Sequence, residues 1–240
     1  MEHGKPAGIA SLVSPPSLLS QRGGMREHVD QAVRSALLAG RFIPGKAVTL
    51  RGLAQELGVS PMPVREVIQR LAAEHALVVL SNGRVQVPKM TAARFDEVLK
   101  ARLLLEPELA AMALENKAEI DTKALEKIDL EIDASLGTGD AEGYMMLNYA
   151  FHFRIYEASR STILLPLVES LWLQFAPFMR TVYGRVGTAH LVDWHKEAIK
   201  AIRAGNVESL RESMASDIRE GMWLLGRSSF PPEEDKQDAF

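Results

Sequence analysis

Two histidines and an aspartate are the residues of this chain best suited to metal chemistry. Asn148 precedes His152 by four residues in "NYAFHFRIYEAS", so both side chains project from one face of a helix. His195 and Asp217 fall on two further predicted helices, since "AGN" at 204–206 interrupts the helical pattern between them. Imidazole nitrogen and carboxylate oxygen are ligands suited to divalent zinc, nickel or manganese. The residue types therefore allow a divalent-metal site inside a helical bundle.

Residue types and spacing leave other interpretations of this group open. A buried histidine is also a common core residue that simply finds a hydrogen-bond partner. Two histidines and a carboxylate also form a catalytic zinc pattern, which would make the helical part a metal-dependent hydrolase. Against the hydrolase, no glutamate or aspartate is obviously placed as a general base.

A second pattern with chemical meaning is "VSPMPVREVIQRL" at 59–71. Ser60 is in position to cap a helix, and Pro61 falls at the first helical position, where a missing N–H costs nothing. Met62 and Arg65 share the exposed side with Ser60, at the positive end of the helix dipole, which attracts phosphate. Arginine there can bind guanine or phosphate. An ordinary capped surface helix is the alternative. The buried face is predicted to hold Val64, Ile68 and Leu71.

The segments around this helix predict a winged helix-turn-helix. A first helix is expected over about 25–39, and a second, "LRGLAQEL", is capped by Thr49 and ended by Gly58. The third helix covers about 61–74. "VVL" and "VQV" then flank "SNGR", in which Asn-Gly predicts a two-residue hairpin turn. This order of helices and hairpin is that of a winged DNA-binding unit.

The rest of the chain is predicted to be helical. The fold class is therefore mainly α, with three helices and a β-hairpin followed by an all-α bundle. A mobile arm is expected at 1–24, a DNA-binding domain at 25–90, a helical domain at 91–226 and a disordered tail at 227–240. The helices of the bundle are expected near 91–116, 121–136, 140–158, 162–184, 187–204 and 206–225.

Composition and charge exclude several classes of function for this chain and favour one kind of partner. Residues 1–90 carry a net charge of +5 and residues 91–240 a net charge of −8, so the first part is suited to a polyanion. The absence of cysteine excludes disulfides, thiol catalysis and cysteine-based metal sites. No apolar run is long enough for a transmembrane helix, and no signal peptide is recognisable, so a cytoplasmic protein is expected.

The first part of the chain resembles a known family. "PGKAVTLRGLAQELGVSPMPVREVIQRLAAEHALVVLSNGRVQV" is similar to the winged helix-turn-helix of GntR-type bacterial transcription regulators, over roughly residues 25–88. Two departures are Pro61, where many relatives have arginine, and His75-Ala76 in place of a small-residue turn. The resemblance implies DNA contacts from Arg51, Ser60, Met62, Arg65 and Gly83.

The second part resembles the FCD effector domain of the FadR-like branch of that family. The similar segments are "RLLLEPELAAMA", "NYAFHFRIYEAS" and "HKEAIKAIRAGN". The resemblance implies a divalent metal held by Asn148, His152, His195 and Asp217, with Asn148 replacing a commoner aspartate and Asp217 a commoner histidine. It also implies that Arg102 faces the same cavity and binds the effector, although a surface ion pair with Glu106 is the alternative for this arginine.

Taken together, these patterns predict a homodimeric transcription regulator, most simply a repressor, and not an enzyme. It would bind a palindromic operator in double-stranded DNA and respond to a small carboxylate held by the metal and an arginine. The apolar stretches "LWLQFAPFM" and "MWLL" are taken as the surface of the dimer. Besides the hydrolase, a constitutive DNA-binding protein without a ligand is the remaining alternative.

Overall fold

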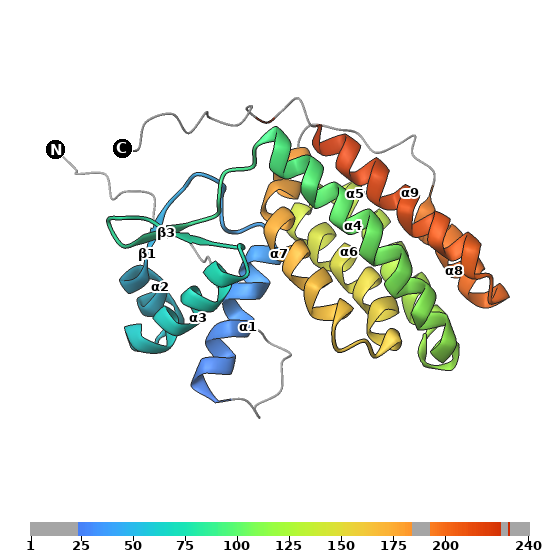
Figure 1. Ribbon diagram of the computed structural model, residues 1–240, viewed down its shortest axis with the longest axis horizontal. Coiled ribbons are helices and arrows are strands. Elements are labelled where there is room, and N and C mark those ends of the chain that lie inside the picture. The colour runs from blue at the N-terminus through green and yellow to red at the C-terminus, as the bar shows by residue number, and fades with distance from the viewer. Residues whose placement is uncertain (1–23, 184–192, 227–229, 231–240) are drawn as a thin grey trace.

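The computed structural model describes residues 24–183, 193–226 and 230. The arm predicted for 1–24 and the tail predicted for 227–240 lie outside these residues, apart from Gly24 and Phe230. Figure 1 shows a three-helix unit with a small sheet on one side and a bundle of longer helices on the other. The fold is mainly helical, as the sequence predicts.

The first unit contains α1 (Met25–Leu38), α2 (Leu50–Leu57) and α3 (Pro61–Ala73). The side chain of Thr49 accepts a hydrogen bond from the Gly52 amide, which caps α2 as predicted. Gly58 ends α2 in the left-handed conformation that glycine adopts at little cost. Ser60 is the residue that precedes α3, but its side chain makes no capping hydrogen bond, contrary to the prediction.

The sheet has one more strand than the sequence predicts. β2 (Val78–Val79) and β3 (Arg84–Gln86) form the predicted hairpin, and β1 (Val48–Thr49) pairs with the other side of β3. The order is β1-β3-β2, antiparallel throughout, with Val48 opposite Val85. A strand of two residues leaves no alternating pattern to recognise, so β1 exists only through its pairing.

The turn of the hairpin also differs from the prediction. Only Gly83, and not Asn82, has a positive φ among the residues of this turn, so the two-residue turn expected from Asn-Gly is wrong. The amide of Gly83 donates to the oxygen of Leu80, and the amide of Leu80 donates to the oxygen of Arg84. A longer loop with a left-handed glycine at its end closes the wing.

The helical domain follows from residue 92. The helix predicted to reach 116 ends at Ala113 and continues as a 3₁₀ segment, η1 (Leu114–Glu119). The helix predicted from 187 begins at Trp194, and residues 184–192 lie outside the described part. The remaining elements are α4 (Ala92–Ala113), α5 (Thr122–Thr138), α6 (Ala141–Tyr156), η2 (Glu157–Ser159), α7 (Leu164–Tyr183), α8 (Trp194–Ala204) and α9 (Val207–Leu225).

Short polar side chains fix where several of these helices start. Asp121, Asp140, Asp193 and Asn206 each accept a hydrogen bond from a backbone amide in the first turn that follows. Such caps satisfy amides that would otherwise lack a partner, and a carboxylate also suits the positive end of the helix. The starts of α5, α6, α8 and α9 are therefore set by local sequence.

The bundle is built from α4 to α9, with α7 on the side next to α1 (Figure 1). α4 packs against α9 and α7, while α5 lies against α6 and α8 (Figure 1). Trp172, Leu173 and Phe175 of α7 are buried, so most of "LWLQFAPFM" belongs to the core of one chain. The prediction that this stretch forms a dimer surface is therefore wrong. None of the described helices combines the length and apolarity needed to cross a bilayer.

Candidate functional site

The structure exposes every residue predicted to contact DNA. Arg51 of α2, Ser60 before α3 and Gly83 in the wing are at the surface. Met62 and Arg65 lie exposed in the first turns of α3, with 65% of the Met62 surface accessible. The opposite face of α3 is buried, as predicted, through Val64, Ile68 and Leu71.

Three of the four predicted metal ligands come together inside the bundle. His152 of α6, His195 of α8 and Asp217 of α9 offer ligand atoms that all lie within 4.8 Å of one another. The His152 Nε2 atom is 3.1 Å from Asp217 Oδ2, and the His195 Nε2 atom is 3.7 Å from Asp217 Oδ1. Two ligand atoms of a tetrahedral zinc ion lie about 3.3 Å apart, so the spacing suits a shared ion.

A hydrogen-bond chain determines which nitrogen of His152 faces this site. The Tyr156 hydroxyl donates its single proton to Glu106 Oε2 at 2.9 Å. The His152 Nδ1 atom lies 3.1 Å from the same hydroxyl, so Nδ1 must be the donor. Neutral His152 therefore keeps the lone pair of Nε2 free, directed to the side of Asp217.

His195 is oriented in the same way by a residue that the sequence analysis missed. Its Nδ1 atom lies 3.3 Å from Asp129 Oδ1, a buried carboxylate of α5 that can only accept. Nδ1 is thus the donor, and Nε2 is again left toward Asp217. A carboxylate behind a histidine is the usual support of a metal ligand. The spacing of Asp129 in the sequence contains no signal of this role.

The Nε2 atoms of both histidines lie close to the Asp217 carboxylate without satisfied hydrogen-bond geometry. Each is buried and, among the described residues, has no partner with hydrogen-bond geometry. A lone pair of His152 or His195 facing a carboxylate oxygen is repulsive unless a proton or a cation lies between them. Two buried nitrogens of this kind beside one carboxylate fit a divalent cation.

The electrostatics of the group keep Asp217 ionised. Burial would raise the pKa of Asp217, but when His152 and His195 are protonated, the His152 hydrogen bond and the charges of both imidazoles and of Arg102 outweigh burial and lower this pKa to about 2. Burial alone would lower the pKa of His195, whereas Asp129, Asp217 and Asp193 together raise it. An ionised carboxylate is the form that binds a metal.

Asn148 lies one turn before His152 on α6 and is half-buried. It lines a pocket of about 10 Å³, which has room for about one water molecule. Trp172 lines the same pocket, and its ring centre is 5.1 Å from that of His152. Asn148 therefore lies near His152 but outside the close group, which consists of His152, His195 and Asp217.

Arg102 is buried, which differs from the surface ion pair considered above. Its guanidinium bonds to both oxygens of Glu106, at 2.5 and 3.2 Å, and Glu106 is fully buried. The cation also lies 3.9 Å from the ring centre of Phe175 and 4.9 Å from that of Trp172. Glu106 Oε2 accepts further bonds from Tyr156 and from the Trp172 indole at 3.1 Å. Glu106 thus links Arg102 to His152.

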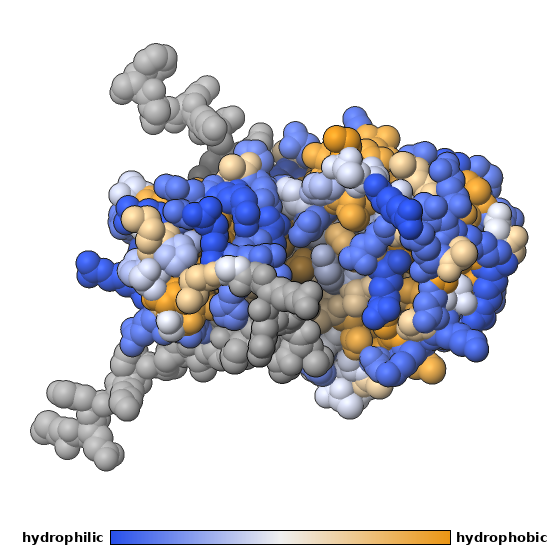
Figure 2. Space-filling view, turned by 90° about the horizontal axis from the view of Figure 1, so that it is seen from below, coloured by the Kyte–Doolittle hydropathy of each residue, from blue (hydrophilic) through white to orange (hydrophobic). Residues whose placement is uncertain are grey.

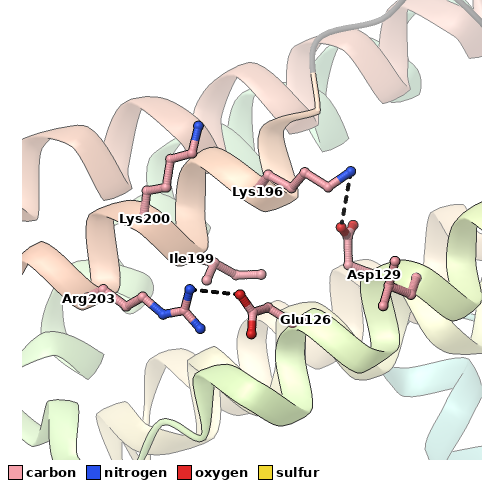
Figure 3. A pocket seen from close by; sticks show the side chains of 7 residues that line it. Glu126, Asp129, Lys196, Ile199, Lys200 and Arg203 are labelled. Atoms are coloured by element: carbon pink, nitrogen blue, oxygen red, sulfur yellow. Dashed lines mark ion pairs between the residues drawn. The ribbon is translucent and has the colours of Figure 1, made fainter.

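A separate groove of about 380 Å³ lies between α5 and α8. Figure 3 shows that its charged side chains pair across the two helices, Arg203 with Glu126 and Lys196 with Asp129. Lys200, its third cation, pairs with Glu197. Because each cation that lines the groove is already paired with an acidic residue, the groove offers little to a carboxylate.

Both the winged unit and the helical domain match known protein families. Residues 25–87 match the bacterial regulatory proteins of the gntR family, and residues 97–220 match the FCD domain. The chain belongs to the GntR family. Within the family it has the FadR-like architecture, a winged helix-turn-helix followed by an FCD domain. It is therefore a DNA-binding transcription regulator rather than an enzyme, and the hydrolase alternative is wrong.

Relatives of known name and structure agree with this family. The regulator McbR of Escherichia coli K12 is 28% identical over 201 residues, covering 82% of this chain and 90% of McbR. The gluconate operon repressor of Bacillus subtilis is 26% identical, covering 89% and 92%. The solved structure of E. coli McbR/YncC superposes with a TM-score of 0.79 at 26% identity, covering 86% and 99%.

Proposed function

We propose that this regulator is a homodimeric repressor whose operator affinity is controlled by a small carboxylate bound beside a metal ion. The winged unit, residues 25–90, would read a palindromic operator in the cytoplasm, and residues 91–226 would bind metal, effector and partner. A relative named as a repressor of a gluconate operon supports the repressor role. The observation that carries the proposal is the fusion of an exposed recognition helix to a group of two histidines and a partly buried carboxylate.

The operator would be read by the amino-terminal end of α3. Arg65 is exposed in the second turn, where its guanidinium can bond to guanine or to phosphate. Met62, beside it, offers an apolar surface to a base edge. Arg51, Ser60 and Gly83 would contact the DNA around this helix.

Replacing Arg65 by alanine is expected to weaken specific DNA binding by about 1–3 kcal/mol, because one base contact is lost. Fluorescence anisotropy at matched salt, on a duplex selected by the wild-type protein from random DNA, would measure the loss. The matched control is Arg160→Ala, which removes an exposed arginine from the helical domain. Equal affinities of Arg65→Ala and the wild type would contradict the assignment of α3.

The metal would be held by His152, His195 and Asp217, with Asn148 as a neutral oxygen ligand nearby. Zinc, nickel and manganese all suit nitrogen and oxygen ligands. Few protein ligands leave coordination positions open, and the ion would supply a Lewis acid site for an effector carboxylate there. The protein's own part is to hold both Nε2 lone pairs in place, through Tyr156 and Asp129.

Arg102 is proposed as the second contact of the effector. In the structure Glu106 occupies one bidentate edge of the Arg102 guanidinium, through Nε and Nη2, which an incoming carboxylate could also use. An effector would therefore have to share Arg102 or displace Glu106, and Glu106 also holds Tyr156. This exchange gives the pocket two arrangements, and differential binding to them is what regulation requires.

The dimer is proposed to form through the helical domain. Trp223 of α9 is 75% exposed and Leu104 of α4 is 66% exposed, on two helices that pack together. Figure 2 shows hydrophobic residues among hydrophilic ones over the helical half of one face. Exposed large apolar side chains of this kind are suited to a partner subunit.

The full chain is accordingly expected to sediment as a dimer at micromolar concentration, at about twice its 26.5 kDa mass. Replacing Trp223 by serine should raise the dimer dissociation constant without unfolding the bundle, since its side chain is mostly exposed. Analytical ultracentrifugation would measure both. A monomeric wild-type protein at these concentrations would contradict the dimer.

A further inference from the structure

The carboxyl end of the recognition helix is held by three side chains of the helical domain. Ser170 Oγ and Gln174 Nε2, one turn apart on α7, both donate to the main-chain oxygen of Glu74, at 3.1 and 3.2 Å. Arg94 of α4 donates to the main-chain oxygen of His75 at 2.9 Å and to Gln174 Oε1 at 2.9 Å. Arg94, Ser170 and Gln174 are called the clasp below.

The clasp acts on backbone atoms that need partners. The last carbonyl oxygens of a helix receive no hydrogen bond from an amide of the same helix. Glu74 is the C-cap of α3, so its oxygen is one of them. His75 follows with φ of 59°, the left-handed conformation that turns the chain out of the helix. Arg94 also places a positive charge at the negative end of the helix dipole. Because the bonds go to the backbone, they fix the position of the helix end itself.

Ion pairs beside the clasp join α1, the end of α3 and α7. Arg34 of α1 lies 2.6 Å from the Glu74 carboxylate and 3.6 Å from Glu169 of α7. These three side chains are partly buried. Directional hydrogen bonds and ion pairs restrict the angle between two units more than apolar contact does.

The other face of α7 reaches the buried polar network. Trp172 bonds to Glu106, and Phe175 lies against the Arg102 guanidinium. Ser170 and Gln174, which hold α3, therefore share one helix with residues that contact the proposed effector site. A rearrangement around Glu106 that shifts α7 would therefore also move Ser170 and Gln174.

We propose that Arg94, Ser170 and Gln174 are positioning residues that fix the orientation of α3 on the helical domain. This inference rests on the proposed function, since in a dimer formed by the helical domains that orientation sets the separation of the two recognition helices. The clasp would thereby select the spacing between operator half-sites, which is a geometric property of such dimers.

The test compares Ser170→Ala/Gln174→Ala with the wild type on selected duplexes whose half-sites are moved apart or together by one base pair. One base pair moves a half-site by about 3.4 Å and turns it by about 35°. The wild type should lose about 10-fold in affinity on the altered duplexes, or about 1.4 kcal/mol. The double variant should lose less than about 3-fold, because its recognition helices can adjust. A variant that keeps the wild-type dependence on spacing would overturn the inference.

Two further variants separate positioning from general stability. Ser216→Ala, on the exposed side of α9, should keep the wild-type dependence on spacing. Gln174→Glu keeps an acceptor for Arg94 but loses the donor to Glu74, so it should be intermediate. A wild type that selects no DNA would refute the proposed function instead. The clasp is then tested by hydrogen exchange of the His75, Ala76 and Leu77 amides, which should become faster in the double variant, and unchanged exchange would overturn it.

Discussion

His152→Ala combined with His195→Ala is expected to abolish metal retention and to lower the melting temperature of the protein. The Nε2 atoms of both imidazoles face the Asp217 carboxylate, so removing the two side chains removes the nitrogen ligands of the proposed ion. A metal at 1,000 times its dissociation constant stabilises the folded state by about 4 kcal/mol, and this stabilisation would be lost. Affinity for DNA without effector should change less, because the site lies inside the helical domain.

Metal content by mass spectrometry and melting curves with and without chelator would measure this effect. Asn148→Ala should weaken the metal less than either histidine variant, since a neutral amide oxygen is the poorest donor of the set. Asp129→Asn should lower metal affinity by about 10- to 100-fold without removing a ligand, because it orients His195. The control is His28→Ala on the exposed side of α1.

Two results together would refute the metal site. One is a wild-type protein that carries no metal after native purification. The other is a melting temperature that does not respond to added zinc, nickel or manganese. His152 and His195 would then be core residues, and Asp217 would serve as their counter-charge.

Glu106→Gln is expected to destabilise the folded protein by about 3–5 kcal/mol, because it leaves a buried arginine without its counter-charge. Arg102 is 4% exposed and Glu106 is fully buried, so water cannot replace the lost carboxylate. The glutamine keeps an acceptor for Tyr156 and Trp172 but places an amide NH2 against Arg102 Nε, so the change removes both the charge and one acceptor of Arg102.

Urea denaturation of the metal-free protein would measure this loss apart from metal binding. Arg102→Met in addition to Glu106→Gln should recover part of the stability, since no charge then remains buried. Glu119→Ala, which breaks the exposed pair with Arg160, should cost less than about 1 kcal/mol. If Glu106→Gln cost no more than Glu119→Ala, the pair would have no structural importance.

Local sequence was sufficient to predict the three helices of the winged unit and the hairpin strands β2 and β3. The caps and stops that define α2 and α3, Thr49, Gly58 and Pro61, act within a few residues of where they stand. The periodicity of α3 alone separates its buried face from the side that carries Met62 and Arg65. β1 escaped prediction because a two-residue strand is stabilised by β3, 35 residues or more further on, and not by its own pattern.

For the candidate metal site, the sequence predicted the ligands, and the tertiary structure decided how they are oriented. Residue types and helix breaks identified His152, His195 and Asp217 as possible ligands, and the family resemblance supplied the grouping. Of the supporting partners, Tyr156 follows His152 by four residues and so shares its helix face, whereas Asp129, the partner of His195, comes from a helix with no motif and could not be identified. Which nitrogen each histidine presents depends on those partners, and therefore on the tertiary structure.

Arg102 and Glu106 show the limit of the sequence most clearly. Their spacing of four residues predicts an ion pair on one helix face, and that pair is present. The same spacing describes Lys127 and Glu131, which remain largely exposed on α5. Only the packing of α7 over α4, with Trp172 and Phe175 against the guanidinium, buries one pair and not the other. Whether a side chain is buried depends on the elements that pack around it. The sequence therefore determined that Arg102 and Glu106 pair, and the tertiary structure decided how strong that pair is, because charges interact more strongly away from water.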